Sequence, residues 1–455
     1  MKTIFITISR GSLIRNFFHT DVVSQLLEKG LQLVVLTPFY KTPEIFPEHN
    51  HPHLILEPLI ETSNLKWNKF FIELEKGAVF NRTVYTRFRY RVSGARPSRV
   101  FFIPRLLLLA PLGFIPFFKK FLRWIDFKIN SENQHDYLLK KYKPDLVFST
   151  AAGGDVSIIK GARRFGIKSV VMPKSWDNLS KLLFNEKADY MIVWSEFMKR
   201  QAMKFQDYRN NQIIVTGGPQ FDYYTHTEKL LTREVFCKRF NFDPRKKIIL
   251  YGSSGGNECC DELAYLELLY EFIKDGTLPD TQVLVRPHLG YLGDADRFLK
   301  TELYPGFTVD RTDKPDHKFR DHWDPSESHL NNLFNSLHHA DVCVNVASTL
   351  TLDAIACGTP TINLAFDVFE GLDPHRSVKR LYQFDYIKAL VGVGGVWVTR
   401  DKAEFFNALK DTLFAGRKKQ EGTDRMIEHF LYRVDGQSAT RIARTLISLA
   451  RAHNI

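Results

Sequence analysis

The chain reads ADVCVNVASTLTLDAIACGTP over residues 340–360, a buried strand followed by the start of a helix. The first half is β-branched and apolar, as buried strands are, and hydroxyl side chains precede the apolar helical segment. Ser348 and Thr349 fall in the first helical turn, where backbone N–H groups lack partners and the helix dipole is positive. The pattern therefore predicts a binding site for the phosphates of a nucleotide.

Asp353 lies four residues after Thr349 on the same helix face. One helical turn rises about 5.4 Å, roughly the step from a phosphate to the ribose of the same nucleotide. The Asp353 carboxylate is therefore expected to accept hydrogen bonds from ribose hydroxyls. An ordinary helix N-cap is the alternative, because Ser and Thr cap many helices without binding a ligand.

A second strand ends in a cation and an imidazole, since residues 282–288 read QVLVRPH. Ligands of parallel α/β sheets bind at the carboxyl ends of strands, so Arg286 and His288 are expected in a binding crevice. Arginine offers a fixed fork for phosphate oxygens, and histidine can donate a hydrogen bond or a proton to a departing phosphate. Solvated side chains at an ordinary strand end are the alternative.

These two segments together resemble the donor domain of GT-B glycosyltransferases. The bacterial cell-envelope enzymes that include the CDP-glycerol glycerophosphotransferases are the most similar group. Further matching motifs follow in the expected order: ISRG at 8–11 with Arg15-Asn16, SWDN at 175–178, VWSE at 193–196 and VTGGPQFD at 215–222. The resemblance implies an α/β protein with two Rossmann-like, doubly wound parallel-sheet domains that face a cleft, and a C-terminal helix that packs back on the first domain.

Length and composition agree with two domains. The chain has 455 residues, of which 44% are hydrophobic and 25% charged, which is typical of globular proteins too long for one core. We expect an acceptor-binding domain at 1–222, a polar linker at 223–245, a nucleotide-donor domain at 246–430 and a returning C-terminal helix at 431–455.

Strands and helices alternate along both halves, as a doubly wound sheet requires. Helices are expected at 16–28 and 438–452. The expected strands are 3–8, 31–36, 146–149, 168–171, 190–193 and 212–215 in the first half, and 247–252, 283–286, 307–309, 342–346, 361–364 and 396–398 in the second.

Cysteine usage favours a cytoplasmic protein. The five cysteines form no CxxC pair and are odd in number, which argues for reduced thiols. The apolar run at 3–8 is too short for a secretory signal and reads better as a strand.

The net charge of +12 is concentrated in one segment. Residues 82–125 hold ten basic residues and no acidic one, around an uncharged run at 106–118 that is too short to span a bilayer. We expect an insertion of the first domain that docks on an anionic membrane surface through residues 99–125, at the inner face of the plasma membrane. A buried helical hairpin with solvated arginines is the alternative. No nucleic-acid-binding module accompanies the charge, so no nucleic-acid partner is expected.

The chemistry of the resembled enzymes needs groups for the donor and for the acceptor. On the donor side, Arg286, His288, Ser348 and Thr349 are expected to stabilise the leaving nucleotide phosphate. The turn Ser253-Ser254-Gly255 follows a strand, and its amides are expected to approach the ligand closely.

The catalytic base is expected from the first domain. We favour Asp177, because the neighbouring Trp176 can stack on a sugar and raise the pKa of the carboxyl group by desolvation. Asp155 and His19 are alternatives, although Asp155 fits a helix cap better. The acceptor is expected to contact the first βα turn and these neighbouring segments, through Gly11, Arg15, Asn16, Asp155 and Trp176.

No metal or cofactor is expected. Asp294-Ala295-Asp296 has the DxD spacing that binds metal in a different glycosyltransferase fold, but its polar surroundings fit a solvated helix start better. The histidines between His317 and His339 lack the spacing of a metal site.

The expected substrates are a nucleotide-sugar or CDP-glycerol donor and a glycan or lipid-linked acceptor, and a single base favours inversion at a sugar. Glycosyl and glycerophosphoryl transfer both fit the motifs. A hydrolysing UDP-N-acetylglucosamine 2-epimerase also looks similar, but its paired glutamates are replaced by Thr351-Leu352-Asp353, and its glutamate after the fifth strand has no counterpart in Met172-Pro173-Lys174. A non-catalytic nucleotide-sugar-binding protein is a further alternative.

Overall fold

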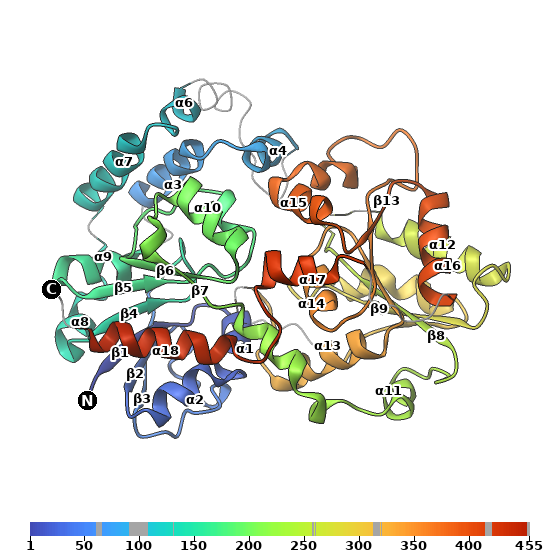
Figure 1. Cartoon of the computed structure of the whole chain (residues 1–455), viewed down its shortest axis with the longest axis horizontal. Coiled ribbons are helices and arrows are strands. Elements are labelled where there is room, and N and C mark those ends of the chain that lie inside the picture. The colour runs from blue at the N-terminus through green and yellow to red at the C-terminus, as the bar shows by residue number, and fades with distance from the viewer. Residues whose placement is uncertain are drawn as a thin grey trace. The chain divides into compact units, whose positions relative to one another are not determined.

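The structure, a computed structural model, describes residues 1–60, 66–90, 108–130, 132–256, 259, 261–312, 319, 321–414 and 421–452. These residues form two compact units, one of 1–85, 108–222 and 432–452 and one of 86–90 and 223–431. Each unit holds one all-parallel sheet with helices packed around it (Figure 1). The α/β class and the two parallel sheets are therefore confirmed.

The sheet of the first unit has seven strands in the order β3-β2-β1-β4-β5-β6-β7. The chain moves outward from β1 through β3 and then restarts at β4 on the other side of β1, so the topological switch point lies between β1 and β4. The strands are β1 (Thr3–Thr7), β2 (Gln32–Thr37), β3 (Leu54–Pro58), β4 (Leu146–Ser149), β5 (Lys168–Val171), β6 (Tyr190–Val193) and β7 (Ile213–Val215).

The sheet of the second unit has six strands in the order β10-β9-β8-β11-β12-β13, with its switch point between β8 and β11. Its central strands are buried except for the half-buried Lys247 at the start of β8, which explains their apolar sequences. The strands are β8 (Lys247–Gly252), β9 (Thr281–Arg286), β10 (Phe307–Val309), β11 (Val342–Asn345), β12 (Thr361–Leu364) and β13 (Trp397–Thr399).

Helices surround both sheets. Those of the first unit are α1 (Gly11–Phe18), α2 (Asp21–Glu28), α3 (Lys66–Ala78), α6 (Ala110–Leu112), α7 (Pro116–Ile129), α8 (Asp136–Tyr142), α9 (Val156–Phe165), α10 (Glu196–Gln206) and α18 (Ser438–Arg451), and α4 (Arg82–Tyr90) starts in it. Those of the second unit are α11 (Arg233–Arg239), α12 (Glu262–Lys274), α13 (Glu327–His339), α14 (Leu350–Ala356), α15 (Asp385–Val393), α16 (Lys402–Phe414) and α17 (Thr423–Met426).

The predicted strands are found within one or two residues of their expected ends. One strand, β3, was missed, because His51-Pro52-His53 precedes it and it ends at Pro58, both of which read as loop. The single helix expected at 16–28 is two helices, α1 and α2, which are separated at His19-Thr20.

The polar stretch at 223–245 is not a free linker. It contains α11 and lies within the second unit. Its Arg233 side chain donates to the main-chain oxygens of His339 (2.7 Å) and Pro244 (2.8 Å). These bonds attach the stretch to α13 and to the loop before β8, so Arg233 serves packing within the unit.

The C-terminal helix α18 packs on the first unit beside α2 (Figure 1). The buried Asp222 carboxylate accepts hydrogen bonds from the main-chain N–H groups of Ser438 (3.1 Å) and Ala439 (2.7 Å), which begin this helix. Gln25 of α2 donates to Thr440 (2.9 Å). The helix is therefore anchored at its N-terminus by an acceptor more than 200 residues earlier in the chain.

Replacing Asp222 by Ala should lower the free energy of unfolding by about 1–3 kcal/mol, because two buried N–H groups lose their acceptor. Denaturant unfolding of the full chain measures this change. The exposed Asp435→Ala variant is the matched control, since an exposed ion pair contributes about 0–1 kcal/mol. Equal effects of both substitutions would contradict the anchoring role of Asp222.

Helix α7 has a buried basic side and an exposed aromatic side. Lys119 and Arg123, which we expected to face a membrane, are 6% and 5% exposed and contact Asp207 at 3.2 and 3.0 Å. Both cations are buried against this carboxylate, so the expectation was wrong for these two residues. Residues 99–107 of the predicted docking segment lie outside the described residues.

The opposite side of α7 exposes Phe117, Phe121 and Trp124, which are 74%, 42% and 51% exposed. Their rings stack in succession with centroids 6.2 Å apart. Lys120 and Lys128 are exposed, and the acidic Asp126 is buried. Within the described part of the chain, no helix combines the length and apolar character needed to cross a bilayer.

Candidate functional site

The carboxyl end of β9 forms one wall of a pocket. Arg286 is 7% exposed, and its Nη1 donates to Asp310 Oδ2 at 2.8 Å. Asn332 donates to the same oxygen at 3.0 Å, and Arg286 Nη2 lies 3.4 Å from His329 Nδ1. The guanidinium is therefore held in one orientation, with part of its charge balanced by Asp310.

His288 follows two residues later and is fixed through its main chain and its ring. Its N–H donates to Asp294 Oδ2 (2.8 Å), and its Nδ1 accepts the N–H of Gly290 (3.0 Å). Because Nδ1 is an acceptor here, the neutral ring carries its proton on Nε2. Burial lowers the pKa of His288, which favours this neutral form.

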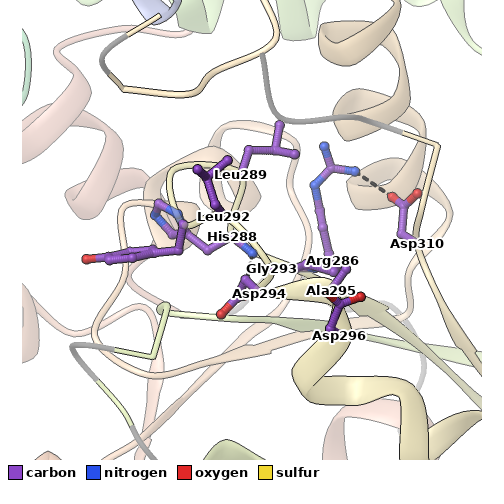
Figure 2. A pocket seen from close by; sticks show the side chains of 11 residues that line it. Arg286, His288, Leu289, Leu292, Gly293, Asp294, Ala295, Asp296 and Asp310 are labelled. Atoms are coloured by element: carbon purple, nitrogen blue, oxygen red, sulfur yellow. Dashed lines mark hydrogen bonds and ion pairs between the residues drawn. The ribbon is translucent and has the colours of Figure 1, made fainter. Parts of the chain in front are cut away.

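The pocket at this strand end has a volume of about 270 Å³. Figure 2 shows Arg286, joined to Asp310, together with His288 among the side chains that line it. The remaining lining residues are Pro287, Leu289, Tyr291, Leu292, Gly293, Asp294, Ala295 and Asp296. The pocket therefore combines a fixed cation and a proton-bearing imidazole with carboxylates and apolar groups.

Asp294 is not a solvated helix start. It is 3% exposed, and its second oxygen, Oδ1, accepts from Arg297 Nη1 at 2.6 Å. Asp296 is exposed, so the two carboxylates of the DxD segment have different surroundings. Among the described residues, no group of three or more His, Cys, Asp or Glu side chains is arranged to hold a metal ion.

The turn Ser253-Ser254-Gly255 uses its amides internally, contrary to our expectation. The N–H of Ser253 donates to Arg286 O (2.9 Å), that of Ser254 to Glu262 Oε1 (2.8 Å) and that of Gly255 to Ser253 Oγ (3.0 Å). Gly255 has a φ of 83°, and a Cβ there would lie 2.2 Å from the Tyr291 ring. The turn therefore supports the pocket from behind, and its predicted amide contacts with a ligand are wrong for this structure.

Glu262 supports the turn beside the pocket, a role that the sequence did not reveal. It is fully buried, accepts from the hydroxyl of Ser253 (2.9 Å), and lies 3.1 Å from Arg297 Nη1. Burial raises the pKa of this carboxyl group to about 7. An acidic residue in the first turn of a helix usually reads as solvated, so only the fold shows its role.

The predicted phosphate site at α14 is partly satisfied by the protein itself. Ser348 is half-buried and its Oγ accepts the N–H of Leu350 (3.2 Å), while Thr349 is exposed. Asp353 is 8% exposed and accepts from the Tyr224 hydroxyl at 2.8 Å, where a ribose hydroxyl was expected. Ser348 therefore bonds to the first residue of α14, whereas Thr349 holds the N-cap position without a side-chain cap bond, and one Asp353 oxygen has a protein partner.

Asn345 at the end of β11 is a second residue that was missed. Its Oδ1 accepts from the N–H of Ser348 (3.3 Å), from Thr351 Oγ1 (3.0 Å) and from Asn363 Nδ2 (3.1 Å). This single buried oxygen fixes the path from β11 into α14.

In the first unit, Trp176 and Asp177 differ from their expected roles. Trp176 is 1% exposed, so its ring has no free face with which to stack on a sugar. One oxygen of Asp177 forms an ion pair with Lys181, and the other accepts from Asn178 (3.1 Å). The base that we favoured is therefore paired with a cation.

Asp155 lies at the switch point between β1 and β4. Its carboxylate accepts from the hydroxyls of Thr7 and Ser149 (3.1 Å for Ser149), and burial raises its pKa to about 6. It makes no side-chain cap to α9, so the helix-cap interpretation was wrong. Its hydrogen bonds instead join the ends of the two central strands.

The other predicted acceptor residues lie in α1. Gly11 begins this helix, and Arg15 Nε donates to Asn16 Oδ1 at 2.9 Å. Asn16 is 4% exposed, whereas Arg15 and the nearby His19 are half-buried. Their contacts with an acceptor remain predictions.

Comparison with known proteins identifies the family. The family profile of CDP-Glycerol:Poly(glycerophosphate) glycerophosphotransferase matches residues 162–448, more than half of the chain. The chain belongs to this family. The match supports a transferase that uses a nucleotide-activated donor, and it includes the whole pocket at the end of β9.

Solved structures with similar folds confirm the GT-B-like fold. A putative UDP-N-acetylglucosamine 2-epimerase from Listeria monocytogenes has a TM-score of 0.56 at 11% identity, with 100% of this chain and 98% of that chain covered. A glycosyltransferase from Rickettsia africae has a TM-score of 0.52 at 11% identity, with 99% and 98% covered. At such low identity these proteins show the fold alone. A sequence search finds no match among curated proteins.

Proposed function

We propose that this glycerophosphotransferase-family protein transfers a group from a CDP-activated donor such as CDP-glycerol to a hydroxyl of a cell-envelope glycan or lipid-linked acceptor. The proposal places the donor phosphates in the pocket at the end of β9. The observation that carries it is the neutral His288 ring with its proton on Nε2, beside the fixed Arg286 cation. Transfer of a sugar from a nucleotide-sugar is the alternative.

The proposed step is a displacement at phosphorus without a metal or a cofactor. The acceptor oxygen bonds to the phosphorus that carries glycerol, and the bond from this phosphorus to the bridging oxygen of CMP breaks. His288 Nε2–H donates to the departing phosphate, where negative charge develops. The proton of the acceptor hydroxyl goes to a carboxylate of the first unit, for which we propose Asp177. With a nucleotide-sugar donor, the same groups would give inversion at the anomeric carbon.

Replacing His288 by Gln should lower kcat by about 100-fold or more, because the departing phosphate loses its proton donor. CMP release from CDP-glycerol in the presence of an acceptor measures the rate. The exposed His375→Gln variant controls for loss of a histidine in the same unit. A rate within twofold of wild type in His288→Gln would remove His288 from the mechanism.

Replacing Asp177 by Asn should lower kcat by about 100-fold while leaving the Kd for CDP unchanged, because a general base acts on the acceptor alone. Asp155→Asn is the comparison, since it keeps the shape of the other candidate base. Rate loss in Asp155→Asn with an active Asp177→Asn enzyme would assign the base to Asp155. In that case the rate should rise as pH passes about 6, where the Asp155 carboxyl group loses its proton.

We also propose a cytoplasmic location with docking at the inner face of the plasma membrane, through the exposed side of α7. Phe117, Phe121 and Trp124 are suited to the apolar part of the lipid headgroup region. Lys120 and Lys128 flank these rings, and each contributes about 1 kcal/mol near an anionic surface. Asp126, the only acidic residue in 108–130, is buried and so does not oppose this attraction.

The triple change of Phe117, Phe121 and Trp124 to Ser should abolish flotation with vesicles that contain anionic lipid, because the buried apolar area is lost. Phe369→Ser with Trp397→Ser removes two exposed aromatic residues elsewhere and is the matched control. If wild type does not float with anionic vesicles, or if the triple variant floats equally well, the docking proposal fails.

A further inference from the structure

Asp294 of the pocket wall forms a connected network with Arg297 and Glu262, and the proposed reaction does not itself use these three charges. Arg297 Nη1 lies 2.6 Å from Asp294 Oδ1 and 3.1 Å from Glu262 Oε2, and Arg297 Nη2 donates to Cys259 O at 2.9 Å. Asp294 and Glu262 are buried, and Arg297 is half-buried. The guanidinium therefore ties the loop after β9 to the loop between β8 and α12.

Asp294 connects this network to His288. While Oδ1 binds Arg297, Oδ2 accepts the His288 main-chain N–H at 2.8 Å. The negative charge of Asp294 favours a protonated His288 ring, and the adjacent Arg297 cation offsets that charge. A proton donor to a leaving phosphate must hold its ring in the correct position and tautomer, and both depend on this loop.

We propose that Asp294 and Arg297 are positioning residues: Asp294 fixes the loop that holds His288, and Arg297 offsets the Asp294 charge so that the imidazole stays neutral, with its proton on Nε2. This inference deepens the proposed function and rests on it for the catalytic purpose of His288. The ion pair also has an effect that can be measured without substrate. Removing the Asp294 anion and removing the Arg297 cation must move the titration midpoint of His288 in opposite directions.

Other ionisable groups around His288 are already paired or lie farther along the network. Arg286 is paired with Asp310, and Glu262 is paired with Arg297. The Tyr291 and Trp323 rings contact the imidazole edge-on, with centroids 4.9 and 6.2 Å away, and His329 lies behind Trp323. Asp296 is exposed to solvent. Of the carboxylates named here, Asp294 is the one that bonds to His288 directly. Arg297 is the ion-pair partner of Asp294.

The test is an NMR titration of histidine-labelled full-length protein without substrate, in which the His288 signal is assigned by its loss in His288→Gln. Arg297→Gln leaves Asp294 without its cation, so the midpoint of His288 should rise by about one pH unit. Asp294→Asn keeps an acceptor for the main-chain N–H but leaves the Arg297 cation, so the midpoint should fall by about one unit.

Two further variants complete the test. Lys300 is another cation of the segment Ala295–Leu303, and it is exposed and paired with Glu267 of α12 at 2.8 Å. Lys300→Gln should therefore leave the His288 midpoint unchanged. Arg297→Lys keeps a cation beside Asp294, so its His288 midpoint should lie closer to the wild-type value than that of Arg297→Gln. Should Arg297→Gln fail to fold, Asp294→Asn alone decides, because an unchanged midpoint overturns the proposal.

The result separates this inference from the proposed function. A higher His288 midpoint in Arg297→Gln and a lower one in Asp294→Asn support the network, even if the protein turns over no donor. Absence of donor turnover would contradict the proposed transfer reaction alone. Shifts of the same sign in Arg297→Gln and Asp294→Asn, or ring signals typical of a proton on Nδ1 in wild type, overturn the inference.

Discussion

A single hydrogen bond, from the main-chain N–H of His288 to Asp294, fixes the turn on which the candidate site depends. The strand before this turn is buried, so its final residues must place polar groups where the sheet ends. Asp294 accepts a hydrogen bond from one of these groups, the His288 N–H. Its charge is paired with the Arg297 cation, which also contacts Glu262. Loss of any of these partners would leave a buried charge or N–H group unsatisfied, which is far more costly than the bond itself contributes.

The same principle operates at the other strand ends. Asn345 accepts hydrogen bonds from the segment that leads from β11 into α14. Asp155 accepts hydrogen bonds from the last residues of β1 and β4. In both sheets these residues lie at the topological switch point. Buried polar side chains therefore build the loop framework, and the groups that we assign to chemistry are placed on it.

The sequence was sufficient for most of the fold. Buried parallel strands are short apolar runs between turn residues, so β4, β8 and β12 could be predicted to the residue. The strand β3 could not, because its Glu57 and Pro58 read as loop, although Glu57 accepts from Lys141 and Tyr142 in the fold. The site was harder, since the types of residue were visible but their partners were not. Tyr224 lies 129 residues from Asp353, and no local spacing signals that contact.

The central claim is that the donor phosphate binds beside His288 at the end of β9. A crystal structure of the full chain with CDP bound tests it most directly. The account predicts a phosphate oxygen of CDP within about 2.7–3.2 Å of His288 Nε2. A nucleotide bound with its phosphates away from His288, and with the pocket at the end of β9 unoccupied, would contradict it.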